Sequence, residues 1–227
     1  MTFKFTWYGH SAIEIETGGY HLLVDPYLSK NPSASITTSE LRPDFILVTH
    51  GHGDHVGDTV EIARSSGATV ICNHEISKWL DAKGLKTHGL ATGGGYRFPF
   101  GTVKLTNALH GSMLPDGSCG GTAAGFLLTL PDDRKIYLAG DTGLFGDMRL
   151  IGEEGITLAA LPIGDNYTMG PADALRAIHF LNAQHCVPIH YNTHDLIKQD
   201  APAWARTVEA QSACKVHVLT PGQTLEL

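Results

Sequence analysis

The run THGHGDHVGD at residues 49–58 places four metal-competent side chains within six residues. It follows the apolar run 45–48, which is typical of a strand buried on both faces of an α/β protein. Residues 56–67 come next, and their apolar spacing predicts a helix that Gly67 ends. We therefore expect a ligand-bearing loop at the carboxyl end of a buried strand. Its metal-competent side chains are His50, His52, Asp54 and His55.

The spacing of these side chains suits two cations. His50 and His52 are two residues apart and share one side of an extended segment, while the glycines between the ligands let the backbone turn. Asp54 and His55 can then hold a second ion, because imidazole and carboxylate groups suit Zn, Mn, Fe or Ni and leave positions open for water. The other interpretation, a solvated His-rich loop, does not explain the apolar strand that leads into it.

Three further strand-like runs end in a metal-competent residue. They deliver His110, Asp141 and His190, each followed by small or turn-forming residues. A single His at a strand end is more often a hydrogen-bonded structural residue. Three such ends, together with the histidine-rich loop, predict a site assembled from segments distant in sequence.

The remaining pattern favours an α/β fold. Short apolar runs predict about eleven strands, and apolar spacings of three and four predict helices over 75–84, 171–183 and 200–213. This alternation fits a four-layer αββα sandwich. Since no stretch resembles a linker, we expect a single domain over residues 1–227.

Composition and charge exclude several classes of protein. The chain is 42% hydrophobic and 17% charged, which excludes disorder. It shows no apolar run long enough for a membrane span and no signal-peptide layout, so we expect a cytoplasmic protein without membrane association. The net charge of −7 argues against nucleic acid as the main partner. Four cysteines stand singly; Cys72, Cys186 and Cys214 are expected in the core, and Cys119 lies in a glycine-rich stretch.

Several motifs together resemble a known family. The order HxHxDH, then His110, then Asp141 in GDTG, then His190 is similar to the metallo-β-lactamase superfamily. WYGHS near the start, VDP, PIGDNYTMGP and PIHYNT narrow the resemblance to a branch of small metal-dependent hydrolases related to the ascorbate-6-phosphate lactonases. The resemblance covers nearly the whole chain, and its motifs are specific for fold and metals but not for substrate.

The resemblance implies an αββα sandwich of the metallo-β-lactamase type with two divalent metal ions. Zn is the favoured ion, and Mn, Ni or Fe also fit. It implies a shared water, activated between the metals, that attacks an ester, lactone, amide or phosphoester of a small molecule. One metal would be held by His50, His52 and His110, the other by Asp54, His55 and His190, with Asp141 bridging.

Other residues are candidates for catalytic contact. His10 could orient substrate, donate a proton or approach a metal, or it could be a structural His within the sheet. Asp25 is expected to accept a hydrogen bond from a metal-bound His. Tyr167 and Tyr191 could contact an oxyanion or a leaving group, although packing at the pocket wall is the favoured explanation for each of them. Asp54, His10 and Tyr191 form the predicted catalytic set, and no organic cofactor is expected.

Three other classes of protein compete with this interpretation. Diiron oxygen or nitric oxide reductases share the fold but resemble HxExDH, whereas His52 occupies that position here. An RNA or phosphodiester nuclease is the alternative function, disfavoured by the acidic chain. A non-enzymatic metal-binding protein is disfavoured by the complete ligand set. The sequence is compatible with a homo-oligomer and does not identify the substrate.

Overall fold

Two seven-stranded sheets form the centre of the computed structural model, which describes residues 2–227. The order of the first sheet is β14-β1-β2-β3-β4-β5-β6, and the order of the second is β13-β12-β11-β10-β9-β8-β7. The strands of the first sheet are β1 (Lys4–Gly9), β2 (Ala12–Thr17), β3 (Tyr20–Val24), β4 (Phe45–Leu47), β5 (Thr69–Asn73), β6 (Thr87–Leu90) and β14 (Thr224–Glu226). Those of the second are β7 (Gly95–Phe98), β8 (Gly101–Asn107), β9 (Ala124–Thr129), β10 (Lys135–Leu138), β11 (Leu158–Pro162), β12 (His185–Ile189) and β13 (Lys215–Val216).

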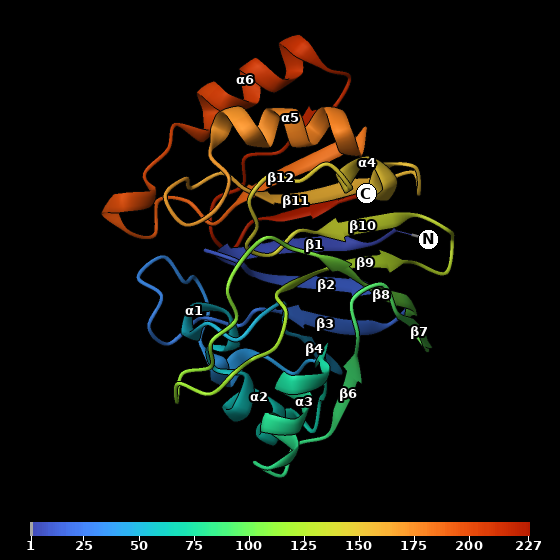
Figure 1. The fold of residues 1–227 in the computed structure, drawn as a ribbon, viewed down its shortest axis with the longest axis vertical. Helices are drawn as coiled ribbons and strands as arrows, with labels where there is room; N and C mark the ends of the chain where they lie inside the picture. Colours follow the sequence, from blue (N-terminus) through green and yellow to red (C-terminus); the bar gives the residue numbers. More distant parts are fainter. Residues whose placement is uncertain (1) are drawn as a thin grey trace.

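Helices cover the outer face of each sheet, as Figure 1 shows. Helices α2 and α3 pack on the first sheet, and α4, α5 and α6 lie over the second. This is the predicted four-layer αββα sandwich, so the expected fold is confirmed. The helical segments are α1 (Gly53–Val56), α2 (Thr59–Ser66), α3 (His74–Asp81), η1 (Thr38–Glu40), α4 (Met148–Gly152), α5 (Pro171–Leu181), η2 (Asp195–Ile197) and α6 (Ala201–Gln211).

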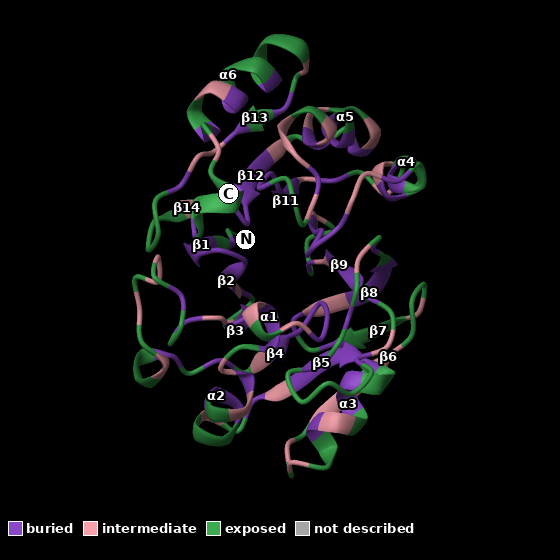
Figure 2. Ribbon diagram, turned by 60° about the vertical axis from the view of Figure 1, so that its left-hand side comes forward, coloured by how far each residue is buried: buried purple, intermediate pink, exposed green. Residues whose placement is uncertain are grey.

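The burial of side chains follows from the strand patterns. In the antiparallel strand β2, Ile13 and Ile15 face the core while Glu14 and Glu16 are less buried. The parallel strand β4 is buried on both faces, as expected for a strand between helices and a second sheet. Figure 2 shows the resulting buried interior between the layers.

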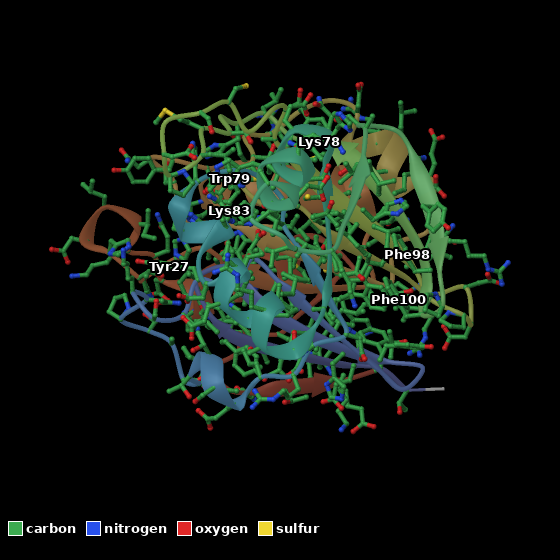
Figure 3. The ribbon with its side chains drawn as sticks, turned by 90° about the horizontal axis from the view of Figure 1, so that it is seen from below. Tyr27, Lys78, Trp79, Lys83, Phe98 and Phe100 are labelled. Atoms are coloured by element: carbon green, nitrogen blue, oxygen red, sulfur yellow. The ribbon has the colours of Figure 1, made fainter. Side chains whose placement is uncertain are left out.

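Aromatic side chains close one end of the inter-sheet core. Phe98 and Phe100 stack with ring centroids 5.4 Å apart, and Phe45 packs on Phe100 at 4.8 Å (Figure 3). Such offset ring pairs add to the stabilisation from area burial. This contact fixes the hairpin of β7 and β8 against β4, the strand that leads into the histidine-rich loop.

Parallel strands bring the predicted site residues to one edge of the molecule. Strands β3, β4 and β5 run parallel, as do β10, β11 and β12. Because the carboxyl ends of parallel strands meet at a common edge, the residues after β3, β4, β10 and β12 can converge there. Those residues include Asp25, His50, Asp141 and His190.

Some elements differ from expectation. Strands β6, β7 and β14 and helices α1 and α4 were not predicted, and the run 215–219 forms a strand only over Lys215–Val216. Cys72, Cys186 and Cys214 are buried and free, as predicted, and Cys119 is exposed. Within residues 2–227, no helix combines the length and apolarity that a membrane crossing requires.

Candidate metal centre

The structure brings all seven predicted metal ligands and His10 together in three overlapping groups. Within each group, one ligand atom from every residue lies within 4.8 Å of the others. The groups are His10, Asp54, His55 and His190; His50, His52 and His110; and His50, His55 and Asp141.

The first three imidazoles converge from two loops. His50 Nε2 lies 3.1 Å from His52 Nδ1, and His110 Nε2 lies 3.2 Å from the same nitrogen. Gly51 allows this approach, because a Cβ there would lie 2.9 Å from the carbonyl oxygen of Ser112. The Ser112 hydroxyl in turn accepts a hydrogen bond from the Gly51 N–H at 3.0 Å. The glycine therefore lets the loop after β8 pack directly on the histidine-rich loop.

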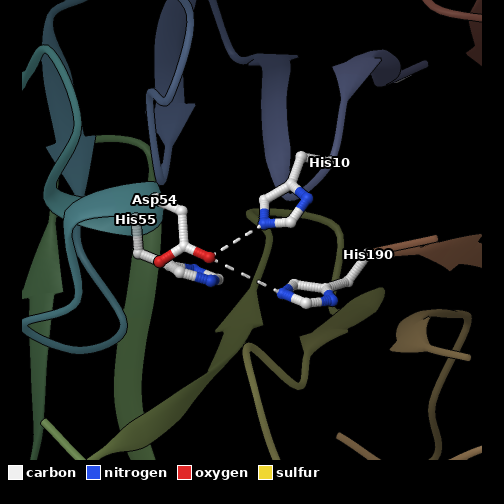
Figure 4. Close-up of side chains that lie close together, drawn as sticks. All are labelled: His10, Asp54, His55 and His190. Atoms are coloured by element: carbon white, nitrogen blue, oxygen red, sulfur yellow. Dashed lines mark hydrogen bonds and ion pairs between the residues drawn. The ribbon is translucent and has the colours of Figure 1, made fainter. Parts of the chain in front are cut away.

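The second group gathers around Asp54 (Figure 4). His10 Nε2 lies 3.2 Å from Asp54 Oδ2, and His190 Nε2 lies 3.9 Å from the same oxygen. The His10 ring is held from its other side, where Nδ1 lies 2.9 Å from the Thr193 hydroxyl. If His10 Nε2–H donates to Asp54, Nδ1 accepts from Thr193, so a single tautomer satisfies both contacts.

Asp141 lies between the two sets of imidazoles. Its Oδ1 is 3.3 Å from His55 Nε2, and its Oδ2 is 3.0 Å from His190 Nε2 and 3.6 Å from His110 Nε2. Asp141 Oδ1, His55 Nε2 and His190 Nε2 are all buried without a hydrogen bond. Buried polar atoms are rarely left without a partner. Lone pairs that point at one another in this way fit a bound cation, so the residues present suit a metal pair.

Asp25 supports one imidazole of each set. Its Oδ2 accepts from His55 Nδ1 at 2.8 Å and from the Thr49 hydroxyl at 2.7 Å, and its Oδ1 accepts from the Thr49 N–H at 2.8 Å. The Thr49 hydroxyl oxygen lies 3.0 Å from His50 Nδ1 and can accept a hydrogen bond from it. Both rings thus keep their Nε2 atoms unprotonated and aimed into the cluster. The contact with His55 is the one expected of Asp25, whereas Thr49 was not singled out from the sequence.

The backbone is unusual at three of these residues. His10, Asp25 and His190 have positive φ angles of 54°, 43° and 53°. Non-glycine residues adopt this region rarely, at a cost of order 1–3 kcal/mol each, and such residues cluster at functional sites. The His190 N–H donates to the His10 carbonyl at 2.9 Å, which ties two of the three together.

Burial and neighbouring charges shift the pKa values of the cluster. Burial lowers the pKa of His10 to about 4, and burial together with nearby imidazoles holds the pKa of His50 well below its ordinary value. Burial alone would raise the pKa of Asp141, but His55 and His190 outweigh it and keep that carboxyl ionised. Burial would likewise lower the pKa of His55, but Asp141 and Asp25 raise it strongly.

A pocket of about 270 Å³ opens onto the cluster. Tyr167, from the predicted loop 164–170, lines it together with His52, Asp54, His110, Asp141 and His190. Tyr191 is placed differently: it is buried against Trp7, with ring centroids 5.4 Å apart and nearly parallel planes. Burial raises the pKa of Tyr191 to about 12, which disfavours the phenolate. These contacts favour the packing interpretation of Tyr191, whose catalytic role stays a prediction, and Tyr167 is the tyrosine that lines the pocket.

Comparison with known proteins agrees with this geometry. A family model described as the Beta-lactamase superfamily domain matches residues 20–191. A UPF0173 metal-dependent hydrolase of Bacillus pumilus is 47% identical over 230 residues, covering 99% of this chain and 100% of that protein. The UPF0173 metal-dependent hydrolase YtkL of Bacillus subtilis is 46% identical, with the same coverage. The structure of Igni18, a metallo hydrolase of Ignicoccus hospitalis, superimposes with a TM-score of 0.93 and 36% identity, covering 100% of this chain and 99% of that one.

Proposed function

This chain belongs to the beta-lactamase superfamily as a metal-dependent hydrolase, and we propose that it works with two divalent cations held side by side. The observation that carries the proposal is the position of Asp141, whose carboxylate reaches imidazoles of both sets: Oδ1 lies 3.3 Å from His55, and Oδ2 lies 3.0 Å from His190 and 3.6 Å from His110. A carboxylate in that position can bridge two cations. We propose that the substrate is a small molecule with an ester, lactone, amide or phosphoester bond.

The distances between ligand atoms indicate how the seven ligand residues would divide between the two cations. The first cation would take His50 Nε2, His52 Nδ1 and His110 Nε2, which lie about one hydrogen-bond length apart. The second would take Asp54, His55 and His190, with Asp141 shared. Nitrogen and carboxylate ligands favour Zn, while Mn, Ni and Fe accept the same set.

The protein supplies orientation and charge around the reacting bond. A bound cation pair would polarise the carbonyl or phosphoryl oxygen of the bond to be cleaved and would lower the pKa of a water molecule to roughly 7. Asp54 stays ionised at neutral pH because the His10 hydrogen bond and adjacent imidazoles outweigh the effect of burial on its pKa. His10 Nε2 holds the Asp54 carboxylate in place, and Asp25 fixes His50 and His55. Tyr167 forms a wall of the pocket in which substrate would lie.

Replacement of Asp141 tests the proposal. We expect Asp141→Ala to retain less than one equivalent of metal and to lose at least about a thousandfold in kcat/KM on ester substrates, because the shared ligand is gone. Metal content is measured by elemental analysis after desalting, beside kcat/KM. Asp147→Asn is the matched control, since Asp147 is an exposed carboxylate six residues further along and outside the cluster. An Asp141→Ala protein with two metals and full activity would refute the bridging role.

A further inference from the structure

We propose that the substrate is an uncharged carboxylic ester or lactone with an apolar chain, rather than a phosphorylated compound. This inference rests on the proposed function and adds the substrate class. Two features around the pocket support this inference. Apolar side chains are exposed next to it, and the loops that form it contain few cationic side chains.

Exposed apolar side chains border the site. Among the described residues, six large apolar side chains are exposed, and three of them form what we call the apolar rim: Leu109, Met113 and Tyr167, at 53%, 62% and 56% exposure. Exposed apolar patches commonly mark binding sites. A ligand with an apolar chain would remove this surface from water, which is favourable in proportion to the area covered.

The side chain of Tyr167 and the backbone of Leu109 and Met113 are placed beside the cluster by specific contacts. Tyr167 lines the pocket itself. Leu109 directly precedes His110, and its carbonyl accepts from the Gly143 N–H, two residues after Asp141. The carbonyl carbon of Met113 would lie 3.2 Å from a Cβ on Gly51, between His50 and His52.

The loops that carry the rim are held in place by polar contacts. The Asn73 amide donates to the carbonyls of Gly120 and Thr122 at 2.6 and 2.9 Å, and the Trp79 indole donates to Asp116 at 2.5 Å. These contacts anchor loop 108–123 to α3 and β5, near the Trp79 and Lys83 labels of Figure 3. The Met169 N–H donates to the Thr142 carbonyl at 2.9 Å, which joins loop 164–170 to the loop of Asp141. The apolar rim is therefore presented on anchored loops.

Cationic side chains are scarce around the pocket. Segments 9–11, 49–57, 108–123, 139–147 and 163–170 contain neither Lys nor Arg. Lys30 and Lys198 lie in neighbouring segments, and Lys198 Nζ is 2.7 Å from Asp195. Proteins that select phosphate groups commonly use Arg forks or Lys in addition to metals. Asp116 and Asp165 add negative charge to the same loops, which disfavours an anionic substrate further.

The reaction on such a substrate is a balanced hydrolysis. Water oxygen bonds to the carbonyl carbon, the bond from that carbon to the ester oxygen breaks, and the departing oxygen takes a proton. An ester gives a carboxylate and an alcohol, and a lactone gives one hydroxy carboxylate, in each case with release of one proton. No other reactant is required.

Substrate preference tests the inference with full-length, metal-loaded protein. The probes are 4-nitrophenyl acetate, butyrate and hexanoate, beside 4-nitrophenyl phosphate and bis(4-nitrophenyl) phosphate. We expect kcat/KM to rise at least about tenfold from acetate to hexanoate and to exceed that on both phosphates, since each methylene covered by the rim adds to binding. Met113→Ser and Leu109→Ser should reduce the hexanoate-to-acetate ratio by at least about threefold.

Leu150→Ser is the matched control. Leu150 is 61% exposed on α4, which lies on the opposite side of the molecule from α1 in Figure 1. We expect this variant to keep the wild-type ratio. Faster turnover of a phosphate, a flat response to chain length, or an equal effect of Leu150→Ser would overturn the inference and leave the proposed function standing. Absence of turnover on every probe by protein that holds two metals would contradict both.

A second readout does not depend on catalysis. The chain has four methionines, of which Met148 and Met169 are buried and serve as internal references. In metal-free protein labelled with ¹³C at the methionine methyl groups, ethyl hexanoate should shift the Met113 resonance, and phenyl phosphate should not. A Met113 shift with phenyl phosphate alone would overturn the inference.

Discussion

At the scale of residues, a single buried carboxylate, Asp25, connects the two halves of the candidate metal centre. Asp25 accepts directly from His55 and, through the Thr49 hydroxyl, fixes the tautomer of His50. These imidazoles belong to different proposed cations. Partners of this kind usually contribute one to two orders of magnitude to metal affinity.

We expect Asp25→Ala to weaken binding of both metals by about 10- to 100-fold, because two imidazoles lose their orienting acceptor. Asp25→Asn should be intermediate, since its amide oxygen can still accept one of these hydrogen bonds. The affinities are measured by competition with a chromophoric chelator. Asp44→Ala is the control, because Asp44 is an exposed carboxylate that precedes β4, at the end opposite the cluster. Wild-type affinity for both metals in Asp25→Ala would show that Asp25 does not hold the ligands in place.

At the scale of elements, close packing of loops positions the ligands. The histidine-rich loop follows strand β4, whose Ile46 and Leu47 are buried, and the loop that carries His110 lies directly against Gly51. This approach leaves no room for a side chain at Gly51. The neighbouring Gly53, at the start of α1, has no atom within 4 Å of the position of a Cβ.

This difference predicts the behaviour of two similar substitutions. Gly51→Ala should separate the loops and reduce metal affinity by more than about tenfold, because ligand geometry tolerates only small displacements. Gly53→Ala should change affinity by less than about threefold, since alanine is a better helix former than glycine. Isothermal titration with Zn compares the two variants. Equal affinities would mean that contact between the loops does not set the geometry of the first imidazole group.

The anchor of loop 108–123 gives a dependence on pH. Hydrogen bonds from Ser118 and Trp79 lower the pKa of Asp116 from 3.8 to about 2. A carboxyl group whose pKa is lower in the folded state stabilises the fold above its unfolded pKa, and this stabilisation is lost as the pH falls through the folded value. In metal-free protein, wild type should therefore resist urea more than Asp116→Asn at pH 5, and the difference should disappear by about pH 2. A difference in midpoint that stays constant over this range would contradict the assignment.

The elements that the sequence predicted are those with a strong apolar pattern. Strands such as β4 and β9 and helix α5 are buried on a face or throughout, so their periodicity is clear. The strands that were missed, β6, β7 and β14, lie at sheet edges and are mostly half-buried or exposed, so they carry little such pattern. Helix α1 has only four residues and α4 only five, too few to show a helical period.

The candidate site was likewise predictable only where its residues follow a clear sequence pattern. The metal-competent residues were identified because each ends a strand or lies in the histidine-rich loop, and the structure brings them together. The sequence could not place the Tyr191 ring, because a tyrosine beside a ligand can turn either to the pocket or to the core, and its stacking partner Trp7 is distant in sequence. Thr49 and Thr193 were missed, since their roles depend on contacts with Asp25 and His10 that only the fold creates.

At the scale of the whole molecule, two sheets place their parallel strands so that loops from both meet at one edge. The first sheet contributes His10, Asp25 and the histidine-rich loop, and the second contributes His110, Asp141 and His190. The candidate centre therefore forms only when both sheets are packed together. Metal ligands shared between the two sheets would also bind them to one another, because a ligand that binds only the folded state stabilises it.

Anomalous diffraction from crystals of the zinc-loaded protein, recorded at the zinc absorption edge, tests the paired metal centre most directly. The account predicts two peaks about 3.5–4 Å apart, one beside His50, His52 and His110 and the other beside Asp54, His55 and His190, with Asp141 in contact with both. A single peak, or zinc bound away from Asp141, would contradict it.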